Sequence, residues 1–401
     1  MNYLIWLALL TSDHLIAGGL WESPDSIERN QREILGLLTS DCPPGYELSQ
    51  QNTCKFFHQY QTYPSILDRG IGGTRTGLPS FRDGFSPALI DLGRHLFFDP
   101  ILSPNQTISC SSCHDPDHGF ADPGAHSIGI SRQPLDRNAP SLWNLGFLNR
   151  FNWDGSAVTL ETQILGPLYN PQEMGNTKEN LVHRLNTSEA YRFLFAKVYE
   201  KDPDRFEISE KHIITALTAF QSTLISLNSR YDRYVHGHHE SLSTEEIRGL
   251  NVFRSFVARC SECHTPPLFT NQQMAVIGAP ERKGLTFDHG AELVFGSKRL
   301  KGGFKVPTLR NITKTAPYMH SGGFQDLSEV LAFYNEGRAA KEGRGLYLHW
   351  HITSPDLAKS ELADLKSFLN ALEDESFKPK RPNITISKLI LNNERRGVTK
   401  Q

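Results

Sequence analysis

Apolar residues recur at spacings of three and four along most of the chain, whereas the strict alternation typical of strands is rare. Such spacing is that of an amphipathic helix with one face turned toward a core. The clearest stripe is Ile213, Ile214, Leu217, Phe220 and Leu224. The pattern therefore predicts a mostly α fold, with helices over residues 26–38, 178–185, 189–199, 210–227 and 356–372.

Helix-start signals predict two further helices. Ser86 followed by Pro87 is an N-cap with a first-turn proline, ahead of an apolar stripe that reaches Phe97. Ser243 and Glu246 form a capping box that opens a helix running to residue 256. Residues 278–303 are rich in glycine and charge and are predicted to be a loop.

A polar, histidine-rich segment at residues 230–243 is the predicted boundary between two units. His236, His238 and His239 could form a metal site, but a solvated linker is the preferred interpretation. A chain of 401 residues accommodates two domains, each with its own core. The predicted organisation is a signal peptide at 1–19, an N-terminal extension at 20–80, units at 81–235 and 236–378, and a polar tail at 379–401.

The formal net charge of −2 is spread along the chain, so the sequence has no basic footprint for nucleic acid. The apolar run from Tyr3 to Leu10 precedes small residues and resembles the core of a secretory signal, although it lacks a positive n-region. An interfacial anchor and an incorrectly assigned start are the alternatives. The run is too short to cross a bilayer.

The candidate chemistry lies in the cysteines. Four of the six belong to two pentapeptides, Cys110-Ser111-Ser112-Cys113-His114 and Cys260-Ser261-Glu262-Cys263-His264. Each is a c-type haem attachment signature, because two thiols at this spacing can bond both vinyl groups of one porphyrin while the histidine binds the iron. A zinc half-site or a redox dithiol would need a second ligand pair or a βαβ context. The sequence therefore predicts two covalent haems c.

The other two cysteines, Cys42 and Cys54, are predicted to form a local disulfide, which together with covalent haem indicates an oxidising compartment. Apart from the haem signatures, no repeat of short period is evident. Electron-transfer haems usually take methionine or histidine as the sixth ligand. Beyond the initiator the chain has Met174, Met274 and Met319, so the first haem region has no methionine before Met174.

Several motifs resemble those of the bacterial di-haem cytochrome c peroxidases and their relative MauG, over about residues 81–372. They are Leu92-Gly93-Arg94 with Leu96-Phe97-Phe98-Asp99, Arg137-Asn138-Ala139-Pro140-Ser141-Leu142, Trp153-Asp154-Gly155, Lys305-Val306-Pro307-Thr308-Leu309-Arg310-Asn311, and Thr315-Ala316-Pro317-Tyr318-Met319-His320. The resemblance implies two cytochrome c-like helical domains. The haem on His114 would bind peroxide, and the haem on His264 would handle electrons.

The same resemblance implies roles for individual residues. Trp153 would lie between the haems and couple them, the alternative being an aromatic that packs the interface. Gln163, Pro167 and Glu173 would form the distal pocket of the first haem, with Glu173 as the acid–base carboxylate. Met174 is predicted to be a packing residue. A calcium ion between the domains would be held by the Asn138 side chain and by backbone oxygens of Thr315 and Pro317.

The resemblance makes Tyr334 the sixth ligand of the second haem, where peroxidases that use a reduced haem carry methionine and MauG-like members carry tyrosine. A phenolate favours ferric iron, which implies activity from the ferric state. The alternative is that Met319 is the ligand and Tyr334 packs on a helix face; Tyr318 is a weaker rival.

The predicted function is reduction of hydrogen peroxide to water by a periplasmic cytochrome-c peroxidase type oxidoreductase, possible as a homodimer, with electrons from a small cytochrome or cupredoxin. One alternative is MauG-like oxidation of a partner protein. The family's surface tryptophan before the second signature is replaced here by Phe256, Val257 and Ala258, which weakens that alternative. The other alternative is a non-catalytic electron carrier. Trp143 and Trp350 are predicted to be buried.

Overall fold

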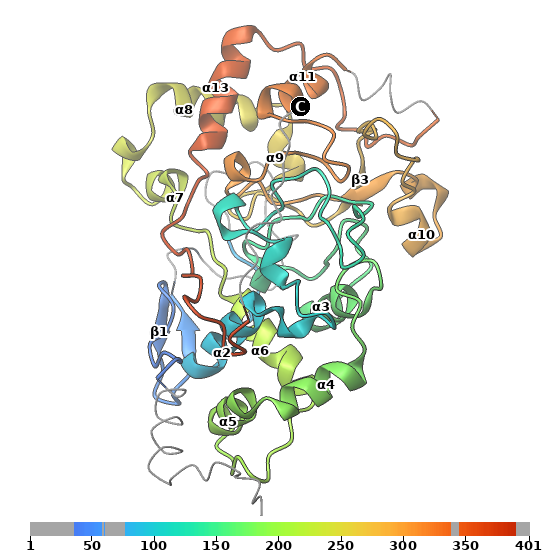
Figure 1. Ribbon diagram of the computed structural model, residues 1–401. Coiled ribbons are helices and arrows are strands. Elements are labelled where there is room, and N and C mark those ends of the chain that lie inside the picture. Colours follow the sequence, from blue (N-terminus) through green and yellow to red (C-terminus); the bar gives the residue numbers. More distant parts are fainter. Residues whose placement is uncertain (1–35, 58–59, 61–76, 338–344, 390–401) are drawn as a thin grey trace, which may run out of the picture.

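The computed structural model describes residues 36–57, 60, 77–337 and 345–389. Helices are the main regular structure, joined by long irregular segments, and the strands form two antiparallel pairs, β1 with β2 and β3 with β4 (Figure 1). The strands are β1 (Tyr46–Leu48), β2 (Cys54–Phe56), β3 (Met274–Val276) and β4 (Gly303–Lys305). The helices are α2 (Pro87–Phe98), α3 (Leu160–Tyr169), α4 (Lys178–Thr187), α5 (Glu189–Val198), α6 (Glu210–Ser222), α7 (Arg230–Val235), α8 (Thr244–Phe253), α9 (Cys260–Cys263), α10 (Ala291–Phe295), α11 (Leu327–Asn335) and α13 (Lys359–Asn370).

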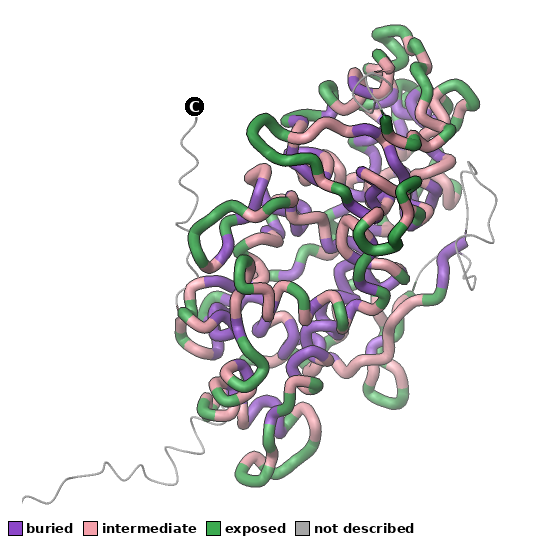
Figure 2. The backbone as a smooth tube through the Cα atoms, turned by 90° about the vertical axis from the view of Figure 1, so that its right-hand side faces the viewer, coloured by how far each residue is buried: buried purple, intermediate pink, exposed green. Residues whose placement is uncertain are grey.

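The buried apolar residues form two large clusters. One gathers side chains from α2 to α6, and the other gathers side chains from α7, α8, α11 and α13. Figure 1 shows these groups of helices at opposite ends, with irregular segments between them. Figure 2 shows buried stretches running through both ends and exposed stretches mainly on outer loops.

The same close helix contact occurs at both ends. A Cβ on Gly93 of α2 would lie 1.9 Å from the Ala216 carbonyl oxygen of α6, and a Cβ on Gly249 of α8 would lie 2.0 Å from the Asp364 carbonyl oxygen of α13. Any side chain at either glycine would separate the two helices. Each cluster therefore depends on one glycine at its central helix crossing.

The chain between these helices also repeats one backbone frame. Left-handed residues, isolated bridges and helix N-caps recur in the same order in both halves, and the two members of every pair are the same number of residues apart. The pairs are Asn144 and Asn311, Phe151 and Tyr318, Asn152 and Met319, Gly155 and Gly322, Ala157 and Phe324, and Thr159 and Asp326.

Hydrogen bonds fix the start of the two frames in matching ways. The Asn144 amide donates to the Leu224 carbonyl, and its Oδ1 accepts from the Ser226 amide. The Asn311 amide donates to Leu372, and its Oδ1 accepts from the Asp374 amide. The two halves are thus built on one plan.

Most predicted helix starts are confirmed. The Ser86 side chain accepts from the Leu89 amide at the start of α2, and the capping box of Ser243 and Glu246 opens α8. Helices α4 and α5 lie where predicted, α8 ends at Phe253, and α13 begins at Lys359, later than expected.

Helix α6 ends at Ser222, so the prediction that it reaches residue 227 is wrong. The Thr223 hydroxyl donates to the Phe220 carbonyl, and the following chain pairs with Asn144 instead of continuing the helix. A side chain from elsewhere in the fold thus overrides the apolar stripe that extends to Leu224.

The predicted linker at 230–243 is partly helical, because Arg230–Val235 forms α7. Asp232 is buried and binds the fully buried guanidinium of Arg310, so this segment is anchored. His236 donates from Nδ1 to the Asp232 carbonyl, while His238 and His239 are exposed. In the described part of the chain these histidines do not gather as metal ligands.

Two other segments are more ordered than the sequence suggests. The predicted loop at 278–303 contains α10. The segment predicted as a polar tail is described as far as residue 389, and there Ile386 is buried in the first cluster and the Ser387 hydroxyl donates to Asp99.

The predicted disulfide is present between Cys42 and Cys54, beside the β1–β2 pair. The signal-like segment and nearly all of the helix predicted at 26–38 lie outside the described residues. Among the described helices, none combines the length and the apolar character needed to cross a membrane.

Candidate functional site

Both Cys-x-x-Cys-His sequences open into one cavity of about 1010 Å³ between the two helical ends. The first lies on a single 3₁₀ turn, Cys110–Ser112, and the second on α9. None of the four cysteines takes part in a disulfide. Burial raises the pKa of the Cys110 and Cys260 thiols to about 12.

The two histidines are held in the same way. His114 donates from Nδ1 to the Phe120 carbonyl at 2.9 Å, and His264 donates from Nδ1 to the carbonyls of Phe269 and Pro307 at 3.1 Å each. Burial lowers the pKa of His114 and lowers that of His264 to about 4, so both rings are neutral. A neutral imidazole anchored at Nδ1 leaves Nε2 to bind iron.

In each half one of the accepting carbonyls comes from a strained residue. Phe120 and Phe269 have φ of 58° and 54°, a left-handed conformation that is costly for an aromatic residue. In both cases this conformation turns the phenylalanine carbonyl back toward the ring of the histidine a few residues earlier in the chain. Strain at matching places in both halves marks the histidines as functional.

The side chains that line the cavity also suit two haems. Its lining is largely apolar, as a porphyrin requires, and it includes Lys305. Burial lowers the pKa of Lys305 to about 8, and within the described residues no carboxylate pairs with it. A buried ammonium facing a cavity suits an anionic partner, and haem carries two carboxylates. Lys305 opens a motif of the family, but no role for it was predicted from the sequence.

The residues expected around the first haem all line the cavity. Gln163 and Pro167 belong to α3, Glu173 lies in the turn that follows it, and all three line the cavity together with His114. Asn170 donates to Glu173 Oε1 at 2.9 Å. Burial nevertheless raises the pKa of Glu173, opposed by that hydrogen bond. Met174 is buried in the first cluster, which confirms its packing role.

The three candidate ligands of the second haem differ in their hydrogen bonds and in their backbone conformation. Tyr318 donates its hydroxyl to the Ile312 carbonyl at 3.0 Å. Met319 lies in a left-handed turn with φ of 70°, and it also lines the cavity. Tyr334 lines the cavity from α11, and no hydrogen bond occupies its hydroxyl among the described residues. Burial raises its pKa, as do the nearby Cys263 and Cys260.

Helices α3 and α11 start at matching N-caps, Thr159 and Asp326. The eighth residue is Pro167 in α3 and Tyr334 in α11. The two halves therefore place a proline and a phenol at equivalent positions, and both line the cavity.

Trp153 lies between the two ends. Its Nε1 donates to the Asn138 carbonyl at 2.8 Å, and its carbonyl accepts from the Lys305 amide at 2.7 Å. Asn138, Thr315 and Pro317, the expected calcium ligands, line the same cavity. The Asn138 Nδ2 donates to the Gly124 and Ala125 carbonyls. Calcium binding by these residues stays a prediction.

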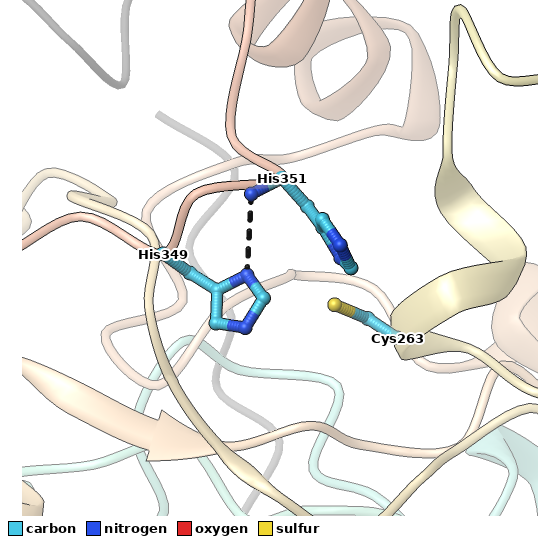
Figure 3. A group of neighbouring side chains, drawn as sticks. All are labelled: Cys263, His349 and His351. Atoms are coloured by element: carbon cyan, nitrogen blue, oxygen red, sulfur yellow. Dashed lines mark hydrogen bonds between the residues drawn. The ribbon is translucent and has the colours of Figure 1, made fainter.

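A second group of ligand-type side chains lies at the edge of the second attachment sequence. Cys263, His349 and His351 place their ligand atoms within 4.8 Å of one another, with the sulfur directed toward the His351 ring (Figure 3). Because Cys263 belongs to the haem signature, its thiol would be bonded to the porphyrin. The group would then lie at the haem edge, and no sequence motif pointed to it. Trp350, next to His351, is 70% exposed, so the prediction that it is buried is wrong, whereas Trp143 is buried.

Comparison with known proteins identifies the family. The model of the di-haem cytochrome c peroxidase family matches residues 87–240. The methylamine utilization protein MauG of Methylorubrum extorquens is 31% identical over 290 residues, which cover 72% of this chain and 79% of that protein. The chain belongs to the di-haem cytochrome c peroxidase family. Membership implies two haems c and an oxidoreductase of the peroxidase type.

Other relatives of this family member carry both kinds of name. A cytochrome c551 peroxidase of Nitrosomonas europaea is 36% identical over 61% of this chain and 71% of that protein. A MauG-like protein associated with microbial copper homeostasis has 35% identity and a TM-score of 0.68, covering 74% of this chain and 92% of that one. The diheme peroxidase BthA of Burkholderia thailandensis has 26% identity and a TM-score of 0.62, covering 78% and 92%.

Proposed function

We propose that the protein reduces hydrogen peroxide to water at the haem on His114, with electrons that arrive one at a time through the haem on His264. The observation that carries the proposal is that Glu173, Gln163 and Pro167 line the cavity into which His114 also opens. An electron carrier would need no partly buried carboxylate there, whereas peroxide chemistry requires a proton acceptor and donor.

The first haem supplies an iron that binds peroxide, and the second supplies a store for electrons. Glu173 takes a proton from the near oxygen of peroxide and returns it to the departing oxygen as water forms. With two electrons and two protons, each peroxide yields two waters. Burial, the cause of the raised pKa of Glu173, suits a group that must both accept and give a proton.

Pro167 and Gln163 shape the pocket beside Glu173. Proline has no group that can bind iron, so with Pro167 at this place in α3 the iron of the first haem would keep a position free for peroxide. Tyr334 takes the equivalent place in α11 and would supply its phenol oxygen as a ligand to the iron of the second haem. A phenolate ligand favours ferric iron, which supports activity without prior reduction.

The Trp153 indole donates to the Asn138 carbonyl and the Trp153 carbonyl accepts from the Lys305 amide, so hydrogen bonds tie this residue to both halves. We assign it the coupling of the two haems. The two helical ends are assigned as cytochrome c-like units, with calcium held by Asn138, Thr315 and Pro317 at their junction. Covalent haem and the Cys42–Cys54 disulfide support a periplasmic location.

The test is rapid mixing of the fully ferric holoprotein with stoichiometric peroxide, followed in the visible and near-infrared haem bands. A fast change without reductant, followed by turnover with a reduced small redox protein, is the expected result. A reaction that begins only after one haem is reduced would favour methionine ligation. No reaction in either state would leave the electron carrier.

MauG-like oxidation of a partner protein is the second candidate. The placement of Tyr334 in the cavity and the 31% identity to a MauG protein favour it. The two candidates differ in turnover: a peroxidase consumes many equivalents of peroxide with a reduced redox protein, whereas a MauG-like enzyme would react with peroxide in the ferric state and gain little from such a donor.

A further inference from the structure

The chain that follows α13 connects the two helical ends. We name residues 374–389 the C-terminal strap. At its start the Asp374 amide donates to Asn311 Oδ1 in the second half, and near its end the Ser387 hydroxyl donates to Asp99 in the first half. Figure 1 shows this segment, in red, running from α13 to α2. The C-terminal strap therefore reaches from one unit to the other.

The middle of the C-terminal strap binds the residue that follows His114. Arg381 Nη2 donates to Asp115 Oδ1 and also to Asp117 Oδ2, the second at 2.9 Å. Asp115 is 2% exposed, whereas Arg381 is only partly buried. Removing the cation from a buried carboxylate is strongly unfavourable. The ion pair therefore holds Asp115 in place beside the first attachment sequence.

Asp115 closes the turn that orients the His114 ring. Its carbonyl accepts from the Phe120 amide at 2.9 Å, and its amide donates to the Ala121 carbonyl at 3.0 Å. Its carboxylate also accepts from His118 Nδ1 at 2.9 Å. The Phe120 carbonyl in turn accepts from His114 Nδ1. A displacement of Asp115 would therefore move the carbonyl that fixes the imidazole.

In the second half a neutral residue takes the place of Asp115. The residue after His264 is Thr265, and its hydroxyl donates to the Ser261 carbonyl at 3.2 Å, within the second attachment sequence. The hydrogen-bond partner of a metal-binding histidine orients its ring and raises the basicity of the nitrogen that binds the metal. An effect of the C-terminal strap on such a partner would thus be confined to the first haem.

We propose that Arg381 is a positioning residue for the first haem. Through Asp115 it fixes the orientation of His114 and the strength of the hydrogen bond at His114 Nδ1. A strong hydrogen bond there makes Nε2 a better electron donor to the iron, which favours cleavage of the O–O bond of peroxide. This inference rests on the proposed function, which assigns peroxide to the haem on His114.

The test is resonance Raman spectroscopy of the dithionite-reduced holoprotein without peroxide. The proposed function leaves one position of the first haem iron free, and a five-coordinate ferrous haem has an iron–histidine stretching band whose frequency rises with the strength of the hydrogen bond at Nδ1. We expect Arg381→Gln to lower this frequency and to slow the reaction of the ferric protein with peroxide about tenfold. Arg381→Lys, which keeps the cation, should restore most of both.

Lys378→Gln is the matched control, because it removes the same charge from the C-terminal strap. Lys378 lies 2.6 Å from Asp117, whose side chain is 54% exposed, so water can replace the lysine. This variant should leave the iron–histidine band in place. In an Asp115→Asn background, Arg381→Gln should shift the band little further, because no buried charge is left for the arginine to pair with.

The proposal is overturned if Arg381→Gln leaves the iron–histidine band in place, if Lys378→Gln moves the band as far, or if the shift persists in full with Asp115→Asn. Peroxide takes no part in the Raman measurement. A missing shift would therefore count against the role of Arg381 even in an active peroxidase, whereas a shift without any reaction with peroxide would count against the proposed function.

Discussion

In the first half of the molecule His114 donates to the carbonyl of a left-handed phenylalanine, and in the second half His264 does the same. Both halves also cross their central helices at a glycine. The difference lies across the cavity, where the eighth residue is Pro167 in α3 and Tyr334 in α11. One frame used twice thus carries a proline and a phenol at the same helix position, and our proposal makes this position the difference between an open and a filled haem face.

A second difference is the carboxylate. Helix α3 is followed by Asn170 and Glu173, which share a hydrogen bond and line the cavity. At the same spacing after the α11 N-cap the sequence has Gly337 and Ala340, so the carboxylate proposed for proton transfer has no counterpart at that position. Changes at these positions should make the halves more alike or more different.

The largest expected effect is that of Glu173→Gln. The amide keeps the size of the side chain but cannot take up the proton, so the rate of reaction with peroxide should fall by about 10²–10⁴-fold. Stopped-flow mixing of the ferric holoprotein with peroxide measures it. The absorption bands of the second haem should be unchanged, and an unaltered rate would remove Glu173 from its role.

Pro167→Tyr should make the first site resemble the second. If the two helix positions are equivalent, the new phenol fills the open face, and the peroxide rate should fall by about 100-fold or more. Resonance Raman and electron paramagnetic resonance spectra of the ferric protein would report a change of spin state at the first haem. A first haem that stays high-spin would show that the helices are not equivalent.

Tyr334→Met tests the reverse position. A thioether favours ferrous iron, and axial ligands move haem potentials over about 0.8 V, so the potential of the second haem should rise by on the order of 0.1 V. The variant should then need reduction before it reacts with peroxide. Spectroelectrochemical titration measures the potential, and an unchanged spectrum would exclude Tyr334 as the ligand and favour Met319.

Much of this frame was predictable from local signals. Ser86 with Pro87 and Ser243 with Glu246 mark helix starts that depend only on neighbouring residues, and both were predicted. The end of α6 was not, because the Asn144 side chain from elsewhere in the fold binds the chain at Ser226. Propensity carries no information about such a distant partner.

The equivalence of the halves had a weak signal in the sequence, since Pro140-Ser141-Leu142-Trp143-Asn144 and Pro307-Thr308-Leu309-Arg310-Asn311 share their proline, leucine and asparagine. The two copies of this pattern lie too far apart in the sequence to be found as a repeat of short period. The haem signatures were predictable because the pentapeptide itself carries the chemistry.

The site beyond the signatures depends on placement that the sequence does not state. The left-handed φ of Phe120 and Phe269 leaves no trace in the residue type, and Trp350 looks like any tryptophan until its exposure is known. The presence of Glu173 in the same cavity as Gln163 and Pro167 was expected only from family resemblance. Its cause is the turn after α3, in which the Met174 amide donates to the Pro167 carbonyl at 3.1 Å.

The smallest expected effect is the dependence of the peroxide rate on pH, which we assign to Glu173. Burial raises the pKa of Glu173, and the hydrogen bond from Asn170 opposes the rise. Below its pKa the carboxyl is protonated and cannot accept a proton from peroxide, so the peroxide rate should increase as pH rises through that raised pKa. This increase in rate should occur at higher pH than for an ordinary glutamate, and it should be absent in Glu173→Gln.

Asn170→Asp sharpens this prediction. The aspartate keeps the oxygen that accepts from the Gln172 amide but replaces the donor to Glu173 with a like charge. Both changes disfavour the ionised form of Glu173 and raise its pKa further. The rise of the peroxide rate should therefore occur at higher pH, while the limiting rate at high pH stays nearly the same. Stopped-flow rates across pH measure the shift. If the substitution does not shift the pH dependence of the peroxide rate, a group other than Glu173 titrates. The contrast between the two halves would then rest on Pro167 and Tyr334 alone.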